Sequence, residues 1–103
     1  MLPLELQTPA EIIGGVADRA RMLRLARGWT QRELADRAGI AFDTLRRFER
    51  TGMISLDRLV KIAVLLGAVR PFGELFAAPP AATLDDLERA ATPRVRAPRR
   101  RKG

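Results

Sequence analysis

Histidine and cysteine are both absent from the 103 residues of this chain. Histidine is the usual general base near neutral pH, and cysteine supplies thiolate nucleophiles and most ligands of structural zinc and iron–sulfur sites. The composition therefore argues against an enzyme. We predict no catalytic residue, no metal site and no cofactor.

Long apolar segments are absent as well. No window reaches the run of about 18 apolar residues that a membrane-spanning helix needs, and the N-terminus lacks the charged and apolar regions of a secretory signal. Tyrosine is missing and aromatic residues make up 5% of the chain, which leaves few rings to stack on RNA bases. We predict a cytoplasmic protein with no membrane partner.

Positive charge is unevenly distributed along the chain. Of the net charge of +7, residues 93–103 contribute +6, because this tail has six basic and no acidic side chains. We expect the tail to reach DNA phosphates, and the alternative is a tail that only aids solubility. The predicted tail contacts are Arg99, Arg100 and Arg101. The organisation predicted from composition is an N-terminal arm (1–7), a helical domain (8–76), and a linker, short helix and basic tail (77–103).

Capping and turn residues predict an all-α fold with five helices. Thr8 and Glu11 form a capping box with Pro9 at the first helical position, and Thr30 and Glu33 form a second box. The predicted helices run from Pro9 to about Arg27, from Gln31 to the turn at Gly39, over Phe42–Arg50, from Ser55 to Gly67, and over Pro71–Phe76. Residues 1–7 alternate leucine with other residues, which is a strand-like period without a partner strand.

Residues 31–50 carry the main functional signal. Ala35 is small where two helices must touch, and Gly39 allows the positive φ of a tight turn, so the segment predicts a helix-turn-helix. The residues expected on the outer face of its second helix are Phe42, Asp43, Arg46, Arg47 and Arg50. Such a row suits guanine edges and phosphates in a major groove. The alternative is an ordinary helical hairpin with a solvated charged face.

The chain resembles the Xre/Cro-type helix-turn-helix regulators over about residues 16–76. The matching positions are Arg24, Thr30-Gln31, Leu34-Ala35, Gly39, Glu49-Arg50, Ser55-Leu56 and Leu66-Gly67. This resemblance implies a five-helix, lambda-repressor-like domain and a nucleoid-associated transcriptional repressor that binds double-stranded DNA. It also implies that Gln31 clamps the DNA backbone, and that Arg24 and Glu49 form a structural ion pair.

Each residue of the outer face has a predicted role. Arg47 is the candidate for a bidentate contact to guanine, and Phe42 for contact with a thymine methyl group. Asp43 either accepts a hydrogen bond from cytosine or caps its helix. Arg46 and Arg50 lie toward the flank and are expected on phosphates.

Small helix-turn-helix proteins bind palindromes as two-fold dimers, so a homodimer is expected. We place the dimer contact on the last two helices with Val69, Phe72, Leu75 and Phe76, unless these side chains only close the monomer core. The turn after Glu49 and the basic tail also resemble HipB-like antitoxins, which implies a HipA-like kinase toxin as partner. A free-standing phage repressor, a protein-interaction module and an RNA-binding module are the alternatives.

Overall fold

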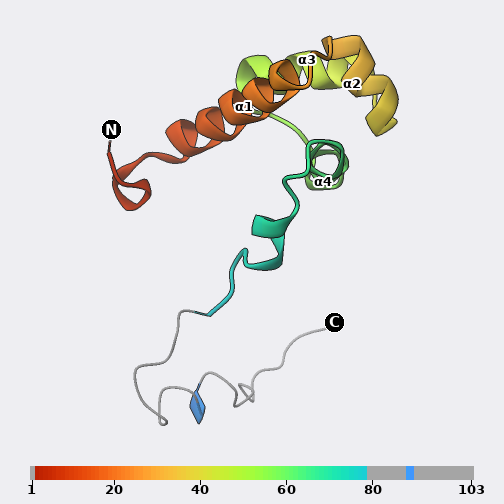
Figure 1. Cartoon of the computed structure of the whole chain (residues 1–103). Helices are drawn as coiled ribbons and strands as arrows, with labels where there is room; N and C mark the ends of the chain where they lie inside the picture. The colour runs from red at the N-terminus through yellow and green to blue at the C-terminus, as the bar shows by residue number, and fades with distance from the viewer. Residues whose placement is uncertain (1, 79–87, 90–103) are drawn as a thin grey trace, which may run out of the picture. The chain divides into compact units, whose positions relative to one another are not determined.

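The structure is a computed structural model that describes residues 2–78 and 88–89. The chain divides into two units, Met1–Phe72 and Gly73–Gly103. All four α-helices belong to the first unit, and the described residues contain no strand, so the all-α prediction is confirmed for them (Figure 1). The predicted linker, short helix and basic tail lie almost entirely outside the described residues.

Helix α1 spans Pro9–Ala26 and begins as predicted. The Thr8 hydroxyl accepts a hydrogen bond from the Glu11 amide, and the Glu11 carboxylate accepts one from the Thr8 amide. The helix ends at the C-cap residue Arg27, followed by Gly28 with a φ of 73°. The two adjacent glycines at 14 and 15 do not interrupt the helix, although glycine is a poor helix former.

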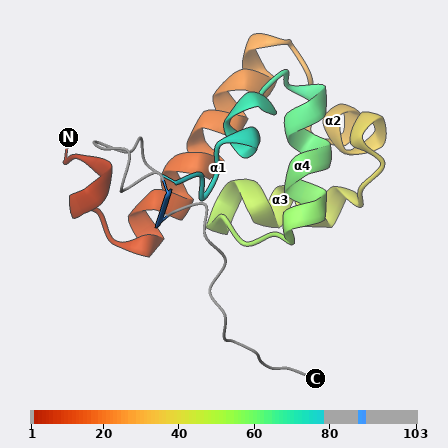
Figure 2. The same ribbon diagram turned by 90° about the horizontal axis from the view of Figure 1, so that it is seen from below.

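The helix-turn-helix consists of α2, Gln31–Ala38, and α3, Phe42–Thr51. The second capping box is present at Thr30 and Glu33. Gly39 has a φ of 71°, the left-handed conformation that lets the chain leave α2 and enter α3 at once. Helix α4 follows as Leu56–Leu65 and packs against α2, as Figure 2 shows.

The core of the first unit lies where these four helices meet. Its largest fully buried side chains are Leu34, Leu45, Phe48 and Ile62. Ala35 is fully buried too, and its small side chain lets α2 approach its neighbours closely. Removing a buried ring such as that of Phe48 costs about 3–5 kcal/mol in comparable cores. The helix-turn-helix is therefore held by packing against α1 and α4, and α1 contacts α3 directly.

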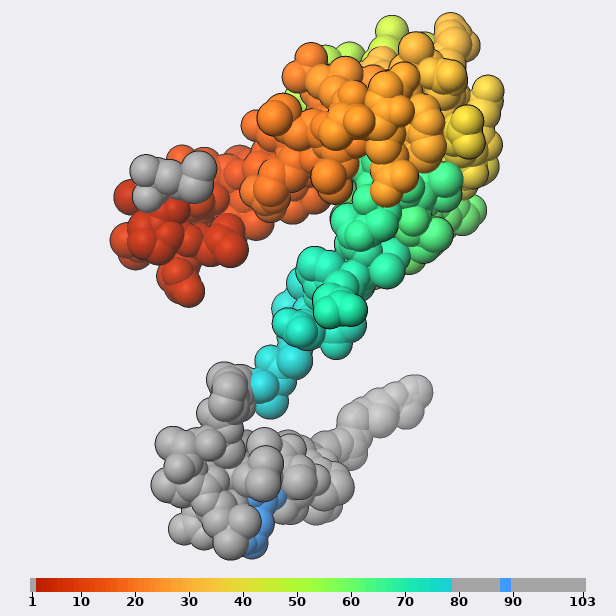
Figure 3. All heavy atoms as spheres, in the orientation of Figure 1, coloured from red at the N-terminus to blue at the C-terminus, as the bar shows by residue number. Residues whose placement is uncertain are grey.

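Two short 3-10 helices flank the four α-helices, and the second replaces the predicted fifth helix. Residues Leu4–Leu6 form a 3-10 helix in place of a strand-like arm, at the end of α1 remote from α2 (Figures 1 and 3). Residues Arg70–Gly73 form another 3-10 helix within the span predicted as the fifth helix, and turn residues follow it. Glycine favours the unfolded chain, so Gly73 disfavours a longer helix here, whereas Pro71 lies in the first turn, where proline is tolerated.

Among the helices of residues 2–78, none has the length and apolar character that crossing a membrane requires.

Candidate nucleic-acid interface

The N-terminus of α2 presents free backbone donors. The capping box uses the amides of Thr30 and Glu33, while those of Gln31 and Arg32, in the first turn, have no hydrogen-bond acceptor among the described residues. The hydrogen bond from the Thr30 backbone, followed by that from its side chain, holds the pKa of Glu33 below its ordinary value. Unpaired first-turn amides and the positive end of the helix dipole favour an anion at this position.

Arg24, Gln31 and Glu49 form a network that joins the first three helices. Arg24 Nε donates to Glu49 Oε2 at 2.7 Å, and Arg24 Nη2 donates to Glu49 Oε1 at 2.9 Å. Gln31 Nε2 donates to the same Oε1 at 2.9 Å, and Arg24 Nη1 donates to the Trp29 carbonyl oxygen at 2.7 Å. The structure therefore brings together Arg24 and Glu49, the residues expected to form an ion pair. Gln31, expected on a phosphate, joins them and keeps its second amide hydrogen for another acceptor.

This network removes the negative charge of Glu49 from the surface. Its side chain is 3% exposed and that of Arg24 is 8% exposed. Arg47 and Arg50 are exposed, and neither makes a side-chain hydrogen bond or ion pair with any described residue. The outer face of α3 is thus cationic although the helix contains two carboxylates.

Asp43 supplies the second carboxylate of α3, and it lies at the surface. It contacts Arg46 Nη2 at 3.2 Å, with 81% of its side chain exposed. The N-cap position of α3 belongs to Ala41, and no side chain caps this helix. The capping alternative for Asp43 is therefore wrong, because α3 begins two residues too early for it.

Phe42 faces outward only in part. Its side chain is half-buried and packs against the core, so the ring predicted on the outer face is only partly exposed. The guanidinium of Arg32 lies 4.0 Å from the centroid of the ring, and that of Arg46 lies 5.6 Å from it. A similar arrangement surrounds Trp29, which is half-buried on the core with two arginines over its ring.

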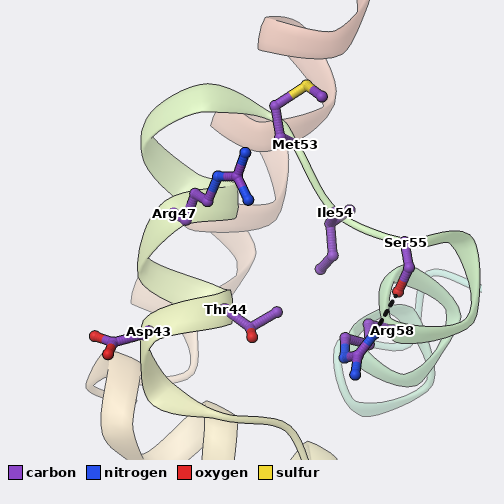
Figure 4. Close-up of a pocket in the computed structure, with 7 residues that line it drawn as sticks. All are labelled: Asp43, Thr44, Arg47, Met53, Ile54, Ser55 and Arg58. Carbon is purple, nitrogen blue, oxygen red and sulfur yellow. Dashed lines mark hydrogen bonds between the residues drawn. The ribbon is translucent and has the colours of Figure 1, made fainter.

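A groove separates α3 from the start of α4. It has a volume of about 500 Å³, and its lining residues are Asp43, Thr44, Arg47, Met53, Ile54, Ser55 and Arg58. In Figure 4, Thr44 and Arg47 point from α3 toward the groove, whereas Asp43 points away from it. Arg58 Nη1 donates to Ser55 Oγ at 3.0 Å across the first turn of α4. The groove therefore carries an arginine on each side.

Sequence reasoning missed Thr44, Arg58 and Arg32. Arg58 lies one helical turn after Ser55, and Thr44 lies one turn before Arg47. Helical spacing from these predicted residues could therefore have indicated both. Arg32 has no such signal, because its contact with Phe42 joins two helices. The predicted tail contacts, Arg99, Arg100 and Arg101, lie outside the described residues. No group of acidic side chains that could hold a metal ion occurs among residues 2–78 and 88–89.

Comparison with known proteins agrees with this geometry. No curated protein matches the chain. A family model described as Helix-turn-helix matches residues 21–72. That span is just over half of the chain and includes α2, the turn at Gly39, α3 and α4. The chain therefore belongs to the Xre/Cro-type helix-turn-helix family of DNA-binding transcription regulators.

Proposed function

We propose that this chain is a transcriptional repressor that inserts α3 into the major groove of a specific operator. The burial of Glu49 carries the proposal. Both carboxylate oxygens of Glu49 accept hydrogen bonds from Arg24 or Gln31, so this charge does not offset the exposed arginines of α3. Three arginines of α3 remain exposed, and only the carboxylate of Asp43 partly compensates their charge. A solvated surface helix has no need for such an arrangement, whereas a helix that approaches phosphates and guanine edges does.

The roles follow from position along α3. Arg47 lies in the middle of the exposed face and is proposed to bind guanine O6 and N7, while Asp43 accepts from cytosine N4 in the first turn. Gln31 and Arg50 bind phosphates on the two sides of the groove, and the free amides at the start of α2 support the first of these contacts.

A homodimer on a palindromic operator completes the proposal. Helix α4 exposes Leu56 and Val64 to the extent of 62% and 58%, and Val69 after it is 43% exposed. A helix that faced only water would carry polar side chains there. A palindrome would require the two recognition helices of such a dimer to lie about 34 Å apart, one helical turn of DNA.

Selection of bound sequences from a random duplex library tests the proposal. We expect a palindrome to be enriched and footprinting to protect it. Arg47→Ala should then weaken binding and relax the preference at one base pair of each half-site, whereas Arg50→Ala should weaken all single-base variants alike. If Arg47→Ala weakens binding to every operator variant equally, Arg47 does not read a base. If the selection enriches no sequence, the proposal of a specific repressor is refuted.

The HipB-like subfamily and a HipA-like kinase partner stay predictions from sequence. Co-expression with a kinase gene adjacent to this one tests them, since a toxin partner should co-purify and an unrelated kinase should not. An RNA-binding module would prefer single-stranded RNA over duplex DNA in a competition experiment, and a protein-interaction module would bind neither.

A further inference from the structure

Two arginines from different helices converge on the ring of Phe42, and the sequence predicted a DNA contact for only one of them, Arg46. Arg32 comes from α2, with its guanidinium 4.0 Å from the ring centroid. Arg46 comes from α3, with its guanidinium 5.6 Å from the same centroid. A guanidinium is attracted to the negative face of an aromatic ring. The ring therefore restricts two long side chains that would otherwise sample many rotamers.

The position of the ring is itself fixed by the fold. Phe42 is the first residue of α3, and its half-buried side chain packs against the core cluster. Arg32 is the second residue of α2. Arg32 thus lies in the first turn of α2, where the helix dipole adds positive potential, and Arg46 lies one turn after Phe42 on α3.

Among the described residues, a carboxylate pairs with only one of these two cations. Asp43 contacts Arg46 at 3.2 Å and is largely exposed. No carboxylate among residues 2–78 and 88–89 lies within ion-pair distance of Arg32. Two guanidiniums over one ring repel each other, and an anion placed against them relieves that repulsion. Arginine binds phosphate oxygens through two parallel hydrogen bonds, which suits a DNA backbone.

We propose that Arg32 and Arg46, held over Phe42, form a clamp for phosphates of the DNA backbone where α2 meets α3. Phe42 is then a positioning residue for the clamp and not a reader of thymine. Arg32 belongs to the helix that lies along the backbone rather than in the groove, which assigns it to phosphate and not to bases. This inference rests on the proposed function and adds Arg32 to the DNA-binding surface.

The test measures binding of a fluorescein-labelled duplex of mixed sequence, and of the selected operator, over a range of salt concentrations. Arg32→Ala should weaken binding to both duplexes about tenfold, the effect of losing a charged hydrogen bond. It should also reduce the slope of log affinity against log salt by about 0.9. Arg37→Ala is the matched control, because it removes one arginine from the same helix. The guanidinium of Arg37 lies over a different ring, 4.8 Å from the centroid of Trp29.

Variants of Phe42 separate positioning from core packing. Phe42→Tyr keeps a ring beneath the arginines and should retain binding and salt slope. Phe42→Leu removes the ring and should weaken binding to both duplexes. Adding Arg32→Ala to this variant should then reduce the affinity by a smaller factor than Arg32→Ala does in the wild type. A thermal melt of each variant establishes that the protein measured is folded.

Each outcome is decisive. If Arg32→Ala binds like Arg37→Ala, the clamp is refuted while operator binding stands. If Phe42→Leu changes the preference at a single base pair and leaves the salt slope intact, Phe42 reads a base and the positioning role is wrong. If Arg32→Ala weakens binding to mixed-sequence duplex but the selection enriches no sequence, the proposed repressor function is refuted and the phosphate clamp is supported. If the wild type binds no duplex at all, both are refuted.

Discussion

Replacing Glu49 by alanine removes one side of a buried ion pair. Arg24 then keeps its hydrogen bond to the Trp29 carbonyl oxygen and loses both bonds to the carboxylate, while only 8% of its side chain is exposed. Leaving one charge of a buried pair without its partner costs about 3–5 kcal/mol. Each kcal/mol lowers the Tm of a domain this small by about 4–8 °C, so the expected fall is at least roughly 12 °C.

Urea and thermal unfolding of Glu49→Ala measure this loss, with Asp43→Ala as the matched control. Asp43 is the other carboxylate of α3, and its pair with Arg46 is exposed, so its removal should change the unfolding free energy by no more than about 1 kcal/mol. The double variant Arg24→Met, Glu49→Leu should recover most of the stability, because it leaves no buried charge. A Glu49→Ala protein that melts like Asp43→Ala yet no longer binds DNA would show that Glu49 acts in recognition and that the structural reasoning is wrong.

Three further outcomes are expected. Gly52→Ala should destabilise the protein, because Gly52 has a φ of 81° and an added Cβ would collide with Ile13, whereas Gly14→Ala in the open middle of α1 should stabilise it by about 0.5–1 kcal/mol; equal melting of the two variants would contradict this. The lowered pKa of Glu33 means that its charge stabilises the fold above the unfolded pKa of 4.5 and that this contribution is lost as pH falls through the lower folded pKa. The urea midpoints of wild type and Glu33→Gln should accordingly converge in acid, and a constant gap would count against the effect. Deleting residues 93–103 should flatten the salt dependence of DNA binding and leave the sequence preference intact, and an unchanged slope would assign the tail no contact with DNA.

Local features were predictable from sequence, and contacts between helices were not. The two capping boxes and the turn at Gly39 depend on residues at most a few positions apart, so their spacing alone indicates them. The contact of Gln31 with Glu49 spans 18 positions and requires the angle between two helices. The burial of Phe42 was missed for the same reason, since Arg32 and the core cover it only after the helices pack.

Helix ends show the limit of propensity arguments. Asp43 is a favourable capping residue, yet α3 starts at Phe42 because the extended conformation falls at Ala41, whose side chain cannot accept a hydrogen bond. The predicted fifth helix contains proline and glycine close together, and only a 3-10 turn forms at Arg70–Gly73. At Asp43 the helix start therefore departs from the capping preference, whereas at Arg70–Gly73 the glycine agrees with the short element.

The ion pair between Arg24 and Glu49 has a consequence for how this protein can evolve. A change at either position alone passes through an intermediate that is several kcal/mol less stable, so the two residues can be exchanged only together. Arg47 and Arg50 make no side-chain hydrogen bond or ion pair among the described residues, so we expect most substitutions there to change stability little. With the proposed role of α3, new operators would be accessible through single mutations on its outer face, while the framework that orients this helix resists stepwise change.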